Sequence, residues 1–187
     1  FGDHEVYAAY AQADVYIDAG DVIVTQTLDT YDDIIVAADP NYSLNDGDTG
    51  SFIGLGYKGS FGDFGLFAEY SVVEVADSAL TDTSGGYIGA SYTMNDYTYH
   101  ITFEVEEDKE KSINNALADN IMQRLGNRGS AGDATSITIG ARRDIGISSA
   151  IKVEVSQYDE SRYTATSGTS KADSSFTQVR IALETMF

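Results

Sequence analysis

Three sets of residues in the chain are of types that could do chemistry, and the first is a set of glycines. Gly54, Gly56 and Gly59 have the spacing of a dinucleotide-binding loop. In such a loop the glycines lead into a helix whose N-terminus holds the pyrophosphate. Here a tight turn and a second alternating segment follow them. We therefore interpret the three glycines as strand residues and expect no cofactor.

The second stretch is acidic. The segment 17–50 holds eight Asp residues and no Lys or Arg, and within it Asn45, Asp46, Gly47 and Asp48 have the composition of a calcium loop. They lack the bidentate Glu at the distance that such a loop requires. We interpret 17–50 as a long, solvated acidic loop that suits weak binding of divalent cations. Its apolar patches at 22–24 and 34–36 predict two short strands.

The third candidate is the pair of histidines, His4 and His100, which are the only two in the chain. A hydrolytic site would set a histidine beside a nucleophile and an orienting carboxylate. No Ser-His-Asp set can be assembled from the spacing around either histidine. The chain has no cysteine, which excludes a thiol nucleophile, a thiolate metal site and a disulfide framework. We expect no enzyme activity and no metal site.

Composition narrows the class of protein further. The chain has 187 residues and a net charge of −19, with only 11 Lys and Arg, so we exclude nucleic-acid binding, which needs cations for the phosphates. No stretch approaches the roughly 20 apolar residues of a membrane helix. One Pro, 18 Gly and 13 Tyr are typical of strands joined by glycine-bearing turns. The chain starts at Phe1 without a signal peptide, from which we expect a processed form or a fragment.

The clearest strand pattern is the last one, at 175–187. Apolar residues and threonines occupy every second position there, and polar residues fall between them. Alternation of this kind is the period of a strand, whose successive side chains point to opposite faces. The apolar stripe consists of Val179, Ile181, Leu183 and Phe187, and the polar stripe includes Gln178, Arg180 and Glu184.

Seven earlier segments alternate in the same way. They are 4–16, 51–58, 63–74, 86–94, 97–106, 135–143 and 149–158. Short turns near Ser60, Asn95 and Ile145 alternate with the long connections 17–50, 76–85, 107–134 and 159–174. Within 107–134 the apolar residues between Ile113 and Leu125 recur at helical spacing, which predicts a short amphipathic helix.

Short turns at one rim and long loops at the other are the plan of a bacterial outer-membrane barrel. We predict an all-β fold, an antiparallel up-and-down transmembrane β-barrel of about eight strands. The whole of 1–187 forms one domain, with 17–50 and 107–134 as extracellular or constriction loops. A soluble barrel such as a lipocalin has the same period with its apolar face turned inward. Aromatic residues at the short-turn ends favour lipid instead: Phe61, Phe64, Tyr97 and Phe187.

The polar stripes of these strands are expected to face the barrel lumen. They combine several glycines, which suit a crowded interior, with charges of both signs. The candidate lumen-lining residues are Lys58, Glu69, His100, Glu104, Arg142, Lys152, Glu154, Arg180 and Glu184. In a narrow eight-stranded barrel these charges would form a salt-bridged plug. In a wider barrel they would line a water-filled channel and bias which ions pass.

The last strand, with Val179, Ile181, Leu183 and the terminal Phe187, resembles the final strand of Gram-negative outer-membrane barrels. In that family the stripe faces lipid and the assembly machinery reads the terminal aromatic. Together with 136–144 and 150–155, it looks like the last three strands of general porins of marine bacteria. Those barrels have about sixteen strands and are often trimeric. The resemblance implies an outer-membrane location, contact with lipid and lipopolysaccharide, a homotrimer, and passive diffusion of small hydrophilic solutes.

An internal repeat bears on the size of the barrel. The residues from Phe1 to Tyr10 align without gaps on those from Phe61 to Tyr70, where Phe61 leads out of a short turn. If Phe1 does the same, the chain is the carboxy-terminal half of a larger barrel. The alternative is a self-contained eight-stranded barrel with a plugged lumen. Such a barrel would act in envelope integrity or bind surface partners through its acidic loops.

Overall fold

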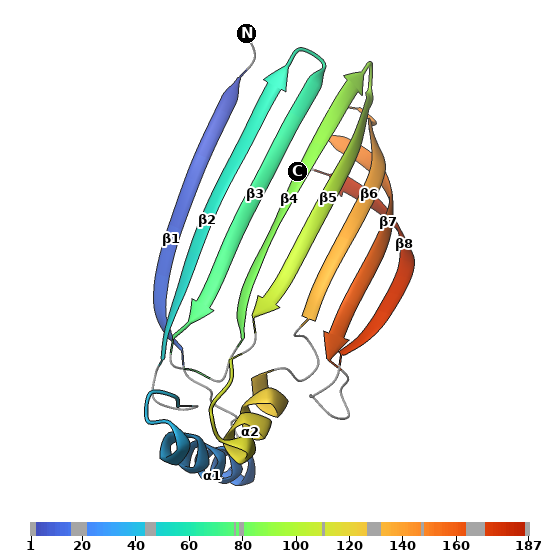
Figure 1. The fold of residues 1–187 in the computed structure, drawn as a ribbon. Helices are drawn as coiled ribbons and strands as arrows, with labels where there is room; N and C mark the ends of the chain where they lie inside the picture. Colours follow the sequence, from blue (N-terminus) through green and yellow to red (C-terminus); the bar gives the residue numbers. More distant parts are fainter. Residues whose placement is uncertain are drawn as a thin grey trace.

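The computed structural model describes residues 3–15, 22–43, 48–76, 78, 81–109, 111–126, 132–146, 148–163 and 171–185. Eight antiparallel strands follow one another in chain order within one sheet (Figure 1). The strands are β1 His4–Val15, β2 Asp48–Phe61, β3 Phe64–Val75, β4 Asp82–Met94, β5 Tyr97–Lys109, β6 Gly132–Asp144, β7 Ser149–Tyr163 and β8 Lys171–Thr185. The predicted all-β, up-and-down arrangement of eight strands is confirmed.

The strands extend beyond the apolar alternation that predicted them. Residues 159–174 were expected to be a loop, but β7 runs to Tyr163 and β8 begins at Lys171, with Asp159 opposite Ser175 and Arg162 opposite Ala172. The backbone ladder needs only N–H and C=O groups, so it continues where the side chains are polar on both faces. Alternation therefore marks the apolar middle of each strand and misses its polar end.

Residues with positive φ occupy the short turns at one end of the sheet. Gly62 has φ 67° between β2 and β3, Asn95 has φ 54° between β4 and β5, and Gly146 has φ 85° between β6 and β7. Glycine and asparagine enter this region at low cost. The longer connections lie at the opposite end of the strands (Figure 1), as the sequence predicts.

The sheet is curved but open. β1 pairs with β2 and β8 pairs with β7, and no pairing joins β1 to β8 in the described residues. The sheet curls most strongly over β6–β8 (Figure 1). The structure therefore shows a barrel-like sector, with two free edges, where the sequence predicted a barrel.

A helix replaces the two short strands predicted at 22–24 and 34–36. α1, Val22–Ala38, is continuous through both patches. Tyr31, Ile34, Ile35 and Ala38 share one face of it, because residues three or four apart are neighbours on a helix. The prediction was wrong because each apolar patch was read alone, whereas the recurrence between positions 31 and 38 has the helical period.

The predicted helix in the second long loop is confirmed as α2, Ala116–Gly126. The Asn115 side-chain oxygen caps it, accepting the N–H groups of Leu117 at 3.1 Å and Ala118 at 3.2 Å. Ile35 of α1 is fully buried against Ala118 and Ile121 of α2. The two helices pack together beyond the loop ends of the strands (Figure 1). Neither helix, nor any other in the described parts of the chain, has the length and apolar character needed to span a bilayer.

The α1–α2 contact generates a prediction about local stability. Ile35→Ala should destabilise the helix pair by about 2–5 kcal/mol, because it leaves a cavity among buried side chains. Hydrogen exchange of the α1 and α2 amides would measure the loss. Leu117→Ala on the exposed side of α2 is the matched control and should change exchange little. Equal effects of the two substitutions would contradict the packing.

Candidate functional site

The two faces of the sheet differ in chemistry, and the pairing register assigns residues to each. All nine predicted lumen-lining residues lie on one face, which we call the polar face. One row across it, for example, runs from His100 through Gly140 and Glu154 to Arg180. The opposite, apolar face carries the stripe of the last strand. Phe187 lies outside the described residues, so the terminal aromatic stays a prediction.

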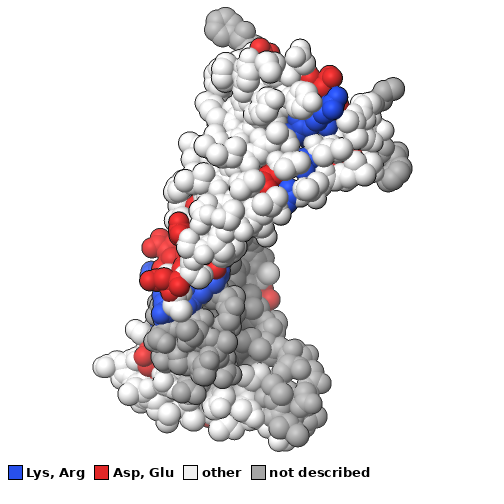
Figure 2. All heavy atoms as spheres, turned by 90° about the vertical axis from the view of Figure 1, so that its right-hand side faces the viewer, with Lys and Arg blue, Asp and Glu red and all other residues white. Residues whose placement is uncertain are grey.

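The apolar face is exposed. On β8, Val179, Ile181 and Leu183 are 64, 75 and 67% exposed. Each of the strands β1 to β7 also exposes large apolar side chains. Most of the strand surface that faces the viewer in Figure 2 is uncharged, and charged atoms gather in a short strip and in a cluster nearer the loop end. Soluble monomers rarely expose apolar side chains in such numbers on one face, and large exposed apolar patches mark protein–protein or membrane interaction sites.

Aromatic side chains border the apolar face at its short-turn end. The rings of Phe64 and Tyr92 lie 4.8 Å apart, those of Tyr97 and Tyr99 stack at 6.2 Å, and Phe61 is exposed beside them. The Arg143 guanidinium lies 5.3 Å from the centre of the Tyr97 ring. Amphipathic rings with a nearby cation are typical of a membrane–water interface.

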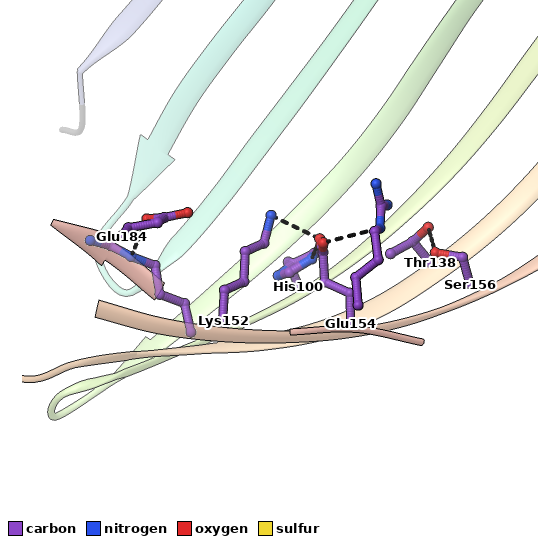
Figure 3. Close-up of polar contacts among 8 residues, drawn as sticks. His100, Thr138, Lys152, Glu154, Ser156 and Glu184 are labelled. Atoms are coloured by element: carbon purple, nitrogen blue, oxygen red, sulfur yellow. Dashed lines mark hydrogen bonds and ion pairs between the residues drawn. The ribbon is translucent and has the colours of Figure 1, made fainter. Parts of the chain in front are cut away.

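Glu154 is the centre of a charged cluster on the polar face. Its carboxylate accepts Lys152 Nζ at 2.8 Å and contacts His100 Nε2 at 3.0 Å. Arg180 Nε lies 3.7 Å from its second oxygen. The side chains of His100 and Glu154 are each only 13% exposed. Figure 3 shows Lys152 and Glu154 projecting from β7 on the concave side of the sheet, with His100 reaching the same carboxylate.

Arg142 extends this cluster toward the short turns. Its guanidinium lies 2.9 Å from Asp144 and 3.4 Å from Glu184. On the other side of Glu154, the hydroxyls of Thr138 and Ser156 share a buried hydrogen bond of 2.7 Å (Figure 3). We define the Glu154 cluster by its charged and titratable members, which are His100, Arg142, Asp144, Lys152, Glu154, Arg180 and Glu184.

The remaining predicted residues lie apart from the Glu154 cluster. Glu69 accepts hydrogen bonds from the hydroxyls of Tyr7 and, at 3.1 Å, Tyr87. Glu104 accepts the Ser136 hydroxyl at 2.9 Å. In the described structure, the hydrogen-bond donors to both carboxylates are therefore neutral hydroxyls. These hydroxyls do not cancel the negative charge of Glu69 and Glu104. Lys58 is exposed on the polar face of β2, where the register sets it opposite Glu5 and Phe67.

Glu69 and Glu104 line a hollow of about 260 Å³ in the polar face. Glu160 and Arg162 line it as well, and the Arg162 guanidinium lies 3.2 Å from Glu160. The polar face thus has two regions. The Glu154 cluster near the short turns mixes charges of both signs, and the hollow nearer the loops is mainly acidic.

Glycines let a side chain extend across a neighbouring strand and contact the strand beyond it. The His100 ring on β5 lies over Gly140 on β6 and so reaches Glu154 on β7. Tyr7 on β1 crosses Gly56 on β2 to reach Glu69 on β3 in the same way. A Cβ added at either glycine would overlap the crossing ring. We call each arrangement a glycine crossing.

Sequence reasoning missed the tyrosine and serine partners and the crossings. The glycines on the polar stripes indicate a crowded interior, but the side chains that cross them depend on the register of three strands. Gly54, Gly56 and Gly59 lie within β2, which confirms that they are strand residues. Residues 45–47 of the calcium-like stretch lie outside the described residues. Within the part that is described, no three potential metal ligands cluster.

Comparisons of the chain with protein-family models, with curated proteins and with solved structures find no match. The function is therefore inferred from the two faces of the sheet and from the contacts on the polar face.

The Tyr7–Gly56–Glu69 crossing generates a prediction about packing. Gly56→Ala should destabilise the protein by about 1–3 kcal/mol, because its Cβ overlaps the Tyr7 ring. In a Tyr7→Ala background the same substitution should cost much less, because the ring is gone. Urea unfolding of the four members of this cycle measures the coupling. Additive effects of the two substitutions would contradict the crossing.

Proposed function

We propose that this chain forms part of a porin-type β-barrel in a bacterial outer membrane, which lets small hydrophilic solutes and ions diffuse passively. The observation that carries the proposal is the opposition of the two faces of one curved sheet. The convex face exposes apolar side chains from every strand, and the opposite face carries the charges at the centres of the strands. Lipid outside and water inside is the environment that satisfies both faces.

Strand length supports this environment. The strands have 12–15 residues. At about 3.3 Å per residue, 12 residues span about 40 Å, or about 28 Å across the bilayer when tilted by ~45°. That distance matches the hydrocarbon core of about 30 Å. The aromatic side chains at the short-turn end would then lie at one interface, close to lipid and lipopolysaccharide head groups.

The free edges favour a large barrel. β1 and β8 each pair on one side only in the described residues. The hydrocarbon core tolerates no open sheet edge, since unpaired N–H and C=O groups find no water there. In this proposal further strands pair with both edges, giving a barrel of about sixteen strands with an aqueous lumen. Trimers of such barrels would be the working form. The eight-stranded barrel with a plugged lumen would need β1 to pair with β8.

Solute choice in this proposal comes from pore width and from the charges on the polar face, without catalysis or a cofactor. The Glu154 cluster holds three carboxylates against three Lys or Arg residues, so its charges balance when His100 is neutral. Glu69 and Glu104, held by neutral donors, add negative potential to the lumen. The channel should therefore prefer cations mildly over anions. The α1–α2 pair would stand at the loop-side mouth.

Conductance across a planar bilayer tests the proposal. The assembled protein should give stable conductance steps with a mild cation preference. Glu69→Gln with Glu104→Gln should reduce that preference, because both carboxylates lie on the polar face. Glu74→Gln with Glu107→Gln removes the same charge from the other face and should leave the preference unchanged. Absence of conductance from correctly folded protein would refute the proposed function.

A further inference from the structure

We infer that His100 makes the ion selectivity of this channel depend on pH, because its side chain is of the type that gains a charge closest to neutral pH. The inference rests on the proposed function, because selectivity requires an open channel. It starts from the crossing of His100 over Gly140 to Glu154.

The position of the ring is fixed by its surroundings. Nε2 of His100 lies 3.0 Å from a carboxylate oxygen of Glu154, and the ring occupies the space above Gly140 that any Cβ would fill. With 13% of its side chain exposed, His100 keeps contact with solvent on the polar face. A proton can therefore reach it, and the charge that it adds stays at one place on the lumen wall.

The charges around His100 come from four strands. β7 contributes Glu154 and Lys152, β8 contributes Arg180 through its contact with Glu154, and β6 contributes Arg142, two residues beyond Gly140. On β4 the residue directly opposite is the uncharged Ser91, and on β5 itself the nearest charged residue of the same face is Glu104. Asp144 and Glu184 pair with Arg142.

The charges of the Glu154 cluster, which does not include Glu104, balance when the imidazole is neutral. The Glu154 cluster then contains Arg142, Lys152 and Arg180 against Asp144, Glu154 and Glu184, a net charge of zero. Protonation of His100 changes the net charge to +1. Glu154 already faces Lys152 and Arg180, so it does not cancel the new charge. Acidification should therefore lower the preference for cations.

Histidine is the suitable side chain type for this response, because the other titratable types ordinarily change charge further from neutral pH. Carboxylates ordinarily titrate near pH 4, and tyrosine and lysine near pH 10. The only other histidine is His4, which lies on the apolar face. Its ring is 4.9 Å from Phe61, and its Nδ1 is 2.9 Å from the Tyr57 hydroxyl. His4 is therefore the matched control for any effect of histidine protonation.

The test is the reversal potential of the assembled channel under a KCl gradient at pH 5.5 and at pH 8. For the unmodified protein, the ratio of cation to anion permeability should be about two-fold lower at pH 5.5, from one added charge near the ion path. His100→Gln should make the ratio equal at the two pH values. His4→Gln should behave as the unmodified protein. If His100→Gln fails to assemble, His100→Asn takes its place.

The outcomes separate the two claims. A pH response that survives His100→Gln, or one that disappears in His4→Gln, would overturn the inference while the proposed channel stands. An unmodified channel with no change in selectivity between the two pH values would overturn it as well. Absence of any conductance at pH 8 would refute the proposed function itself.

Discussion

The structure depends on two constraints. A strand presents successive side chains to opposite faces of the sheet. On the polar face, glycine leaves room for the side chains of neighbouring strands. On the polar face, His100 crosses Gly140 and Tyr7 crosses Gly56, so one side chain connects three strands. Each crossing ends on a carboxylate. A residue with a side chain at either glycine would push the ring off the sheet and break the polar contact. The crowded polar face is thus organised around positions that carry no side chain.

This organisation links the fold to the proposed function. In the proposed barrel, carboxylates held by tyrosine or serine hydroxyls keep their charge available to the lumen, whereas Lys152, Arg180 and His100 surround the carboxylate of Glu154. The same sheet places apolar side chains on its other face at every strand. One alternating sequence would thus supply both the charged inner wall and the apolar outer wall of the proposed barrel. In the proposed barrel, the free edges of β1 and β8 would pair with further strands.

Sequence alone predicted the features that depend on local periodicity. Alternation located all eight strands and predicted that Arg180 and Val179 lie on opposite faces of the sheet, and helical spacing located α2. It missed α1, whose apolar residues form two short patches that resemble strands when read separately. It also missed the contact of Tyr7 with Glu69, since 62 residues and two strand registers separate the pair. Contacts across strands depend on register, and register depends on the whole sheet.

Cysteine labelling along β8 tests the assignment of the two faces most directly, because the chain contains no cysteine of its own. Single cysteines would replace residues 178–183 one at a time, and a membrane-impermeant maleimide would be applied to the protein in intact lipid vesicles. The account predicts alternation: labelling at Gln178, Arg180 and Ala182, and protection at Val179, Ile181 and Leu183 by lipid. Uniform labelling at all six positions would contradict a lipid-facing apolar surface, and with it the proposed barrel.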